Sequence, residues 1–175
     1  MEEIHYTYSL TTAGRKHRVS GADIDVLLRR IPEELWSRLR VVHFNDKSFG
    51  NRTLGYVTGS RREIALCALP TGISFGRVCR RYEQKPRWFG AAWGHQWSDL
   101  AVRRLMLYEV FLHELGHLQV VDKDSPNIRR RFALEKKAQE FADHWRKRLW
   151  LERFEHADRV HNPPSAQELR NDVGP

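Results

Sequence analysis

The sequence predicts a single α+β domain in which a short β-sheet packs on a buried helix. β-Prone runs occur within residues 40–69, an almost wholly apolar helical stretch follows at 99–120, and a second long helical stretch runs from 126 to about 151. With 175 residues, of which 41% are hydrophobic, the chain is long enough to bury one core. We therefore expect one domain over residues 1–155 and a loose C-terminal tail over 156–175.

The N-terminal half carries short elements with clear boundaries. Residues 1–18 are polar and mixed, and they predict no helix or strand. Ser20 and Asp23 form a pattern typical of a capping box, which begins a helix over about 21–31. Runs at 40–44, 54–58 and 63–69 are typical of strands, and the intervening Gly59-Ser60-Arg61-Arg62 predicts a hairpin between the last two.

Residues 71–97 have no helical or strand periodicity and are rich in glycine, arginine and aromatic residues. A loop of this length is often functional, so one interpretation is that it lines a substrate cleft. The other interpretation is that its aromatic side chains pack the loop onto the domain. These side chains are Phe75, Tyr82, Trp88, Phe89, Trp93 and Trp97.

The apolar helix carries a pattern that points to metal chemistry. Ser98 caps it, and apolar residues on nearly all its sides predict a buried helix. Within it, His113-Glu114-Leu115-Gly116-His117 places two imidazoles at i and i+4 on one face, where both reach one zinc ion. Zinc lowers the pKa of its bound water to roughly 7, and Glu114 beside it can accept the proton as a peptide carbonyl is attacked. A histidine pair satisfied by other protein groups is the structural alternative.

This motif and the following helix resemble the gluzincin branch of the zincin metallopeptidases. HELGH precedes Glu135-Lys-Lys-Ala138-Gln-Glu-Phe141-Ala142, and this E-x-x-A-x-x-F-A pattern is similar to the third-ligand helix of ImmA/IrrE-like peptidases and HtpX-type proteases. The resemblance covers roughly residues 54–150. It implies a zincin-like catalytic domain that hydrolyses a peptide or protein substrate, with an extended substrate pairing with the strand before the motif helix, which is 63–69. Gln139 stands where these families often have Asp or Asn, and the gap from His117 to Glu135 is shorter than theirs.

Glu135, Glu140 and His144 compete as the third metal ligand. On a helical wheel of about 100° per residue, one arc of the last helix is apolar. Its members are Leu134, Ala138, Phe141, Ala142, Trp145 and Leu149. The small side chains of Ala138 and Ala142 should let this helix approach the motif helix closely enough for a carboxylate at Glu135 to reach the metal. Glu135 lies at the edge of this arc, whereas Glu140 falls about 140° away from Glu135 and should face solvent. The resemblance indicates the same residue, so we expect His113, His117 and Glu135 to hold the zinc. His144, Tyr82 and His95 are candidates for stabilising the oxyanion.

The chain is basic, with a net charge of +8 and arginine clusters within 77–87, 129–131 and 146–148. Such charge suits nucleic acid, although solvated helix faces carry the same residues.

The sequence shows no signal-peptide pattern and no apolar run long enough to span a bilayer, and two cysteines are too few for a disulfide framework. We therefore expect a cytoplasmic protein without membrane contacts. Two alternatives to a peptidase are a zincin-fold regulator that binds nucleic acid or protein, and a metal-dependent deformylase or amidase.

Overall fold

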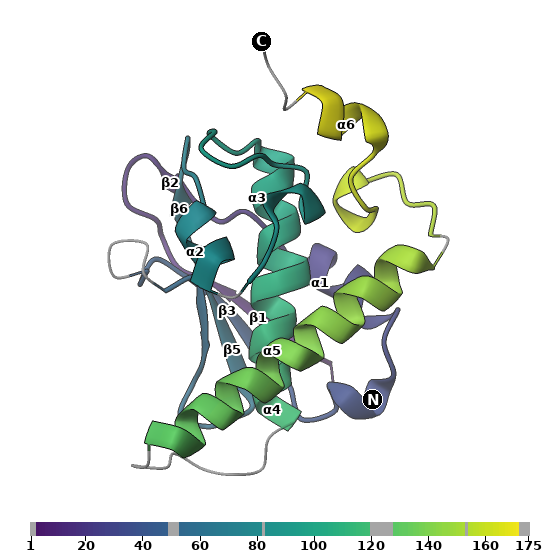
Figure 1. The fold of residues 1–175 in the computed structure, drawn as a ribbon. Helices are drawn as coiled ribbons and strands as arrows, with labels where there is room; N and C mark the ends of the chain where they lie inside the picture. The colour runs from purple at the N-terminus through teal and green to yellow at the C-terminus, as the bar shows by residue number, and fades with distance from the viewer. Residues whose placement is uncertain (1–2, 49–52, 82, 120–127, 153, 172–175) are drawn as a thin grey trace.

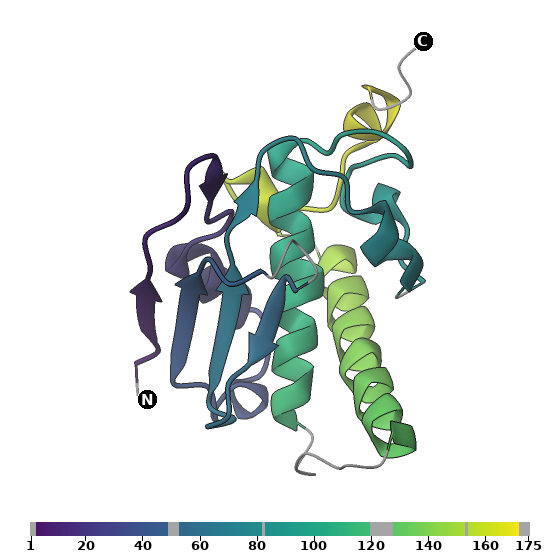
Figure 2. The same ribbon diagram turned by 90° about the vertical axis from the view of Figure 1, so that its left-hand side faces the viewer.

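The fold has three layers, which are a β-sheet, a central helical column and a long outer helix. The computed structural model describes residues 3–48, 53–81, 83–119, 128–152 and 154–171. The sheet lies on one side of the column and the outer helix α5 on the other (Figure 2), and α5 crosses the column diagonally (Figure 1). The α+β class predicted from the sequence is confirmed.

The main sheet has four strands in the order β1-β3-β5-β4. These strands are β1 (His5–Tyr8), β3 (Val41–Asn45), β5 (Glu63–Cys67) and β4 (Gly55–Val57). β1 and β5 both pair parallel with β3, and β4 pairs antiparallel with β5, which confirms the predicted hairpin. β1 was not expected, although Tyr6, Thr7 and Tyr8 are strand formers, because the run is short and its pairing with β3 is a long-range contact. β2 (Arg15–Lys16) and β6 (Leu69–Pro70) form a separate two-stranded pair.

The expectation that residues 63–69 pair with a substrate is wrong. β5 lies between β3 and β4, so its backbone hydrogen bonds are made within the sheet. The strand at the edge beside the motif helix is β4 instead. Strand propensity revealed the hairpin, but it could not show which of its two strands would lie outermost.

The predicted helix starts agree with the capping groups. Ser20 caps α1 (Gly21–Leu28) in a full capping box with Asp23, and the Ser98 hydroxyl accepts a hydrogen bond from Ala101 N–H at the start of α3 (Asp99–Leu105). The column continues through the π-helix η3 (Met106–Phe111) into α4 (Leu112–Gln119). The outer helix α5 is Ile128–Leu151. The predicted turn before α5, including Pro126, lies outside the described residues.

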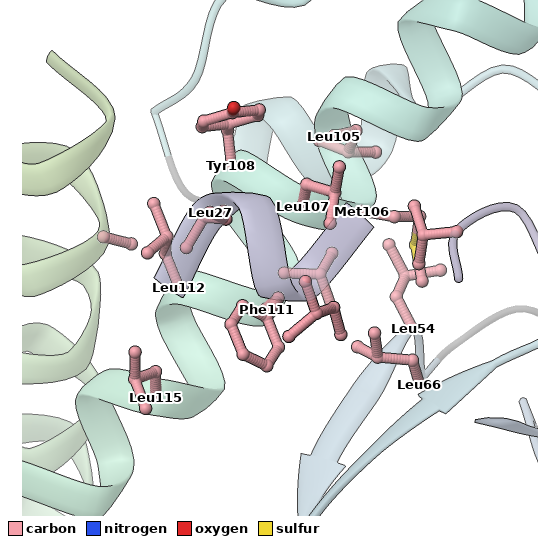
Figure 3. Packing of buried hydrophobic residues seen from close by; sticks show 14 of the residues in the cluster. Leu27, Leu54, Leu66, Leu105, Met106, Leu107, Tyr108, Phe111, Leu112 and Leu115 are labelled. Atoms are coloured by element: carbon pink, nitrogen blue, oxygen red, sulfur yellow. The ribbon is translucent and has the colours of Figure 1, made fainter. Parts of the chain in front are cut away.

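The column forms the centre of the hydrophobic core. All six residues of η3 are buried, and its apolar members belong to one hydrophobic cluster with Leu54 and Leu66 of the hairpin segment, part of which Figure 3 shows. A helix buried on all sides can pack against the sheet and α5 at once, so its apolar surface holds the layers together. No helix in the described parts of the chain is both long and apolar enough to cross a membrane.

Residues 71–97 contain more structure than their sequence predicts, namely α2 (Gly76–Arg81) and the short 3-10 helix η2 (Pro86–Trp88). Phe75 and Phe89 are buried against Trp97, with ring centroids 5.5 and 6.1 Å from its ring. The packing interpretation therefore applies to these three aromatic residues. Trp93 is 46% exposed.

Residues 156–171 are packed on the domain, so the expectation of a loose tail is wrong for this segment. It forms the 3-10 helix η4 (Arg159–His161) and α6 (Ala166–Asn171). Val160 and His161 are buried, and the fully buried Arg104 donates hydrogen bonds to the carbonyl oxygens of Asn162 and Arg159. The segment is polar, so its sequence does not show that it supplies acceptors for a buried arginine.

Candidate metal centre

Two imidazoles converge on one point beside the central column. His113 and His117 lie one helical turn apart on α4, and their Nε2 atoms are 3.1 Å apart. The two rings are nearly perpendicular, at 80°, with centroids separated by 4.8 Å. His113 is buried and His117 is half-buried. Helical spacing alone therefore accounts for the approach of these two ring nitrogens.

Glu135 of α5 completes a group of three ligand atoms. One carboxylate oxygen lies 3.3 Å from Nε2 of His113, and the other lies 3.5 Å from Nε2 of His117. Among the described residues, these three form the group of His, Cys, Asp or Glu that could hold a metal ion. Ligands about 2.0–2.2 Å from a tetrahedral zinc ion are separated from one another by about 3.3–3.6 Å. The 3.1 Å between the two Nε2 atoms, and the 3.3 and 3.5 Å from each of them to an oxygen of Glu135, are close to that range, and one ligand atom from each residue lies within 4.8 Å of the other two.

Close packing of the two helices brings Glu135 to the histidines. A Cβ atom added at Gly116 would lie 2.8 Å from the carbonyl oxygen of Ala138 and 2.9 Å from its Cα. Only a residue without a side chain fits α4 at this contact. The small side chain of Ala138, which the sequence suggested as the basis of a close approach, forms the other side of it.

The two other candidates for the third ligand lie elsewhere on α5. Glu140 is exposed and forms an i,i+4 ion pair with Lys136 at 3.8 Å. His144 is exposed and packs edge-on against Trp145. Of the remaining oxyanion candidates, His95 is exposed and Tyr82 lies outside the described residues. The structure thus brings Glu135, and neither Glu140 nor His144, to His113 and His117.

Glu114 is buried beside the two histidines, and strand β4 packs against it. Burial raises the pKa of its carboxyl group from 4.5 to about 7; Glu135 adds to this rise, whereas His113 and a hydrogen bond from the Val57 backbone oppose it. A Cβ atom added at Gly55 would lie 3.2 Å from Cγ of Glu114, so β4 passes very close to the motif helix. Glu114 can therefore change its protonation state near neutral pH.

The pKa values of the two imidazoles shift in opposite directions. Burial acts to lower the pKa of His113, but a hydrogen bond donated to Glu135 and the charges of Glu114, Glu135 and Glu109 raise it overall. Burial, His113 and the guanidinium group of Arg61 lower the pKa of His117. The two neighbouring rings cannot both be charged at little cost, whereas the carboxylates around them attract a cation. A metal ion held by two neutral imidazoles and a carboxylate satisfies both conditions.

Behind His113 lies a polar network that the sequence did not predict. Nδ1 of His113 is 3.1 Å from Oε1 of Gln139, and Nε2 of Gln139 donates to Glu109 at 2.7 Å and to Asp143 at 3.2 Å. Arg146 forms ion pairs with both carboxylates, the one with Asp143 at 2.6 Å. Burial raises the pKa of Glu109, although Arg146 and Gln139 oppose the rise. A charged residue in an apolar helix, one turn before His113, is the sequence signal that could have revealed Glu109.

The arginine clusters are not all available to a nucleic acid. Arg146 is 1% exposed and paired inside the protein, so its inclusion in a phosphate-binding cluster is wrong. Arg77, Arg80 and Arg87 are exposed. The side chains of residues 129 and 130 lie outside the described part. The basic surface is therefore smaller than the sequence suggests.

The two cysteines lie outside the candidate metal centre. Cys67 and Cys79 are both buried free thiols, and burial raises their pKa values to about 11 and about 12. A buried protonated thiol is a poor metal ligand and a poor nucleophile. Both side chains behave as small core residues.

Comparison of the chain with protein-family models, with curated proteins and with solved structures gives no significant match. The functional interpretation therefore depends on the geometry of His113, Glu114, His117 and Glu135 and on the sequence motif that contains the first three.

Proposed function

We propose that this protein is a zinc-dependent peptidase in which His113, His117 and Glu135 hold the metal and Glu114 is the general base. The observation that carries the proposal is the convergence of His113, His117 and Glu135 beside a buried glutamate, with the two Nε2 atoms 3.1 Å apart and a carboxylate oxygen of Glu135 within 3.5 Å of each. Two imidazoles and one carboxylate form a ligand set found in catalytic zinc sites. Such sites have three protein ligands and leave a fourth position open.

A bound zinc ion supplies a water of lowered pKa and polarises a carbonyl group. The chain itself supplies the proton acceptor. Glu114, with its pKa raised to about 7, accepts a proton from the attacking water in its ionised form and passes it to the leaving amine. Its burial excludes bulk water that would compete for this transfer.

Strand β4 offers a backbone surface for an extended peptide next to Glu114. Thr58 N–H donates to Glu63 O and Cys67 N–H donates to Leu54 O, so the intervening Gly55 and Val57 direct their polar backbone groups away from β5. The Val57 backbone also hydrogen-bonds to Glu114, and an added strand would bind to the remaining groups by β-augmentation. The outer edge of the hairpin thus takes the substrate-pairing role that the sequence resemblance had suggested for 63–69.

The proposal is tested by combining metal analysis with a cleavage assay. Protein purified without chelators should contain one zinc ion per chain, and His113→Ala or His117→Ala should lose it. Incubation with a peptide mixture, followed by mass spectrometry of new termini, should reveal products that the Glu114→Gln variant does not form although it keeps its zinc.

Three outcomes would contradict the proposal. Metal-free wild-type protein would remove the zinc site, and unchanged cleavage by Glu114→Gln would remove the assigned base. Zinc-loaded protein that releases formate from formylated peptides, but cleaves no peptide bond, would show a deformylase instead.

A further inference from the structure

A buried ion pair between Glu109 and Arg146 lies close to the candidate metal centre, and Gln139 separates it from His113. The side chains of Glu109 and Arg146 are 4% and 1% exposed, and the amide of Gln139 joins them to His113. Arg146 packs over Trp88 and Phe89, with its guanidinium carbon 5.0 and 5.6 Å from the ring centroids. The pair is therefore enclosed by apolar rings and polar partners.

Stability alone does not account for such a pair. Removing two charges from water costs several kcal/mol per ion, and apolar residues of similar volume often stabilise a protein equally well. A buried pair is better explained by the geometry that it imposes on its neighbours. Here the neighbour is Gln139, whose amide can present either its oxygen or its nitrogen to His113.

The carboxylates determine the orientation of that amide. Nε2 of Gln139 faces Oε1 of Glu109 at 2.7 Å and Oδ1 of Asp143 at 3.2 Å, and ionised carboxylate oxygens only accept hydrogen bonds. The reversed amide would place its oxygen against both carboxylates. Arg146 donates to both carboxylates and so favours their ionised forms. Oε1 of Gln139 must therefore face His113.

This orientation selects the tautomer of His113. Because Oε1 of Gln139 can only accept, Nδ1 of His113 carries a proton and donates, so in the neutral ring the lone pair lies on Nε2. Nε2 is the atom that faces His117 and Glu135. The preferred tautomer is thus the one that can bind a metal ion at this site.

We propose that Glu109 and Arg146 are positioning residues that fix the Gln139 amide and thereby hold His113 in its metal-binding tautomer. The inference rests on the metal site proposed above, and it adds the residues that orient one of the metal ligands, His113. Glu109 belongs to the π-helix η3 of the same column, whereas Gln139 and Arg146 belong to α5. The same two helices therefore supply both the ligands and the network behind them.

The test is the zinc affinity of Glu109→Gln, measured by competition with a fluorescent chelator. Arg146 can only donate, so it should hold the new amide oxygen and turn the new NH2 group towards Gln139. The Gln139 amide then meets a donor at position 109 and an acceptor at Asp143, so neither orientation is fully satisfied, and the zinc affinity should fall about 10-fold. Nitrogen-15 spectra of the metal-free protein, at a pH where the ring is neutral, should show a smaller fraction of the Nδ1–H tautomer of His113. Glu140→Gln, the same change on the solvent side of α5, should alter neither.

A rearranged network separates positioning from a merely structural role. Glu109→Gln combined with Gln139→Glu and Asp143→Asn places a carboxylate acceptor directly against Nδ1 of His113, and the two new amides can donate to it while Arg146 holds their oxygens. The affinity should return to within about threefold of wild type, whereas independent structural defects would add to one another. If Glu109→Gln does not fold, the triple variant remains the deciding protein, and a loss of more than about tenfold in it would overturn the inference.

The two proposals fail in different ways. Unchanged zinc binding by His113→Ala would overturn the metal site itself. Loss of zinc from His113→Ala, together with wild-type affinity and an unchanged tautomer in folded Glu109→Gln, would overturn only the positioning role.

Discussion

At the scale of single residues, Glu135 and Glu140 differ only in the direction in which α5 presents them. Glu135 lies 3.3 and 3.5 Å from the two imidazoles, whereas Glu140 pairs with Lys136 in solvent. The helical wheel distinguished them because an amphipathic helix has one inner face. The wheel could not show the hydrogen bond between His113 and Gln139, which depends on the separation of two helices.

Glu135→Ala should weaken zinc binding by more than about 100-fold, because it removes one of three ligands, a larger loss than that of an outer hydrogen-bond partner. Chelator competition measures the affinity, and circular dichroism checks the fold. Glu140→Ala is the matched control, with the same truncation on the same helix, and should bind zinc as the wild type does. The reverse result would show that the inner face of α5 has been misassigned.

At the scale of elements, the contact between α4 and α5 decides whether a metal site exists. The sequence predicted both helices and suggested close packing at Ala138, but the closest contact is made by Gly116 inside the HELGH motif. Two of the motif's neighbouring positions therefore have separate tasks. His117 provides a ligand atom, and Gly116 allows Glu135 to approach it.

Gly116→Ala should lower the free energy of unfolding by about 1–3 kcal/mol through overpacking against Ala138. It should also weaken zinc binding, because α5 must move away from α4 and carry Glu135 with it. Urea denaturation and chelator competition measure the two effects. Gly59→Ala is the control, since an added Cβ atom there meets nothing within 4 Å. Wild-type stability and affinity in Gly116→Ala would mean that the helices do not approach so closely.

At the scale of the whole molecule, the C-terminal segment 156–171 packs against the N-terminal half of the central column, where it contacts Arg104 and Tyr108. Nδ1 of the buried His161 lies 3.2 Å from the hydroxyl group of Tyr108, and the His161 backbone carbonyl accepts a hydrogen bond from Arg30. Burial and His156 lower the pKa of His161 to about 4, although Asp23 and Asp158 oppose this shift and Arg103 adds to it. His161 is therefore neutral in the folded protein over a range in which an unfolded chain binds a proton.

The folded protein should lose stability as the pH falls from about 6.5 to about 4. In this window the unfolded state binds more protons than the native state, so acidification favours unfolding, by up to about 3 kcal/mol from His161. Urea denaturation at pH 7 and pH 4.5 should show a smaller acid loss in His161→Gln than in the wild type. His95→Gln, which changes an exposed histidine, should follow the wild type. Equal losses in all three proteins would exclude His161 as the source.

The sequence by itself determined the α+β class, the capped helix starts, the hairpin and the spacing of His113, Glu114 and His117. These features depend on side-chain periodicity and on contacts between residues near one another in the chain. Only the tertiary structure decided that β4 is the outer strand, that Gln139, Glu109 and Arg146 form one network, and that residues 156–171 cover the column. Each of these depends on contacts between distant segments, where the polar groups that must pair on burial find their partners only after the layers have assembled.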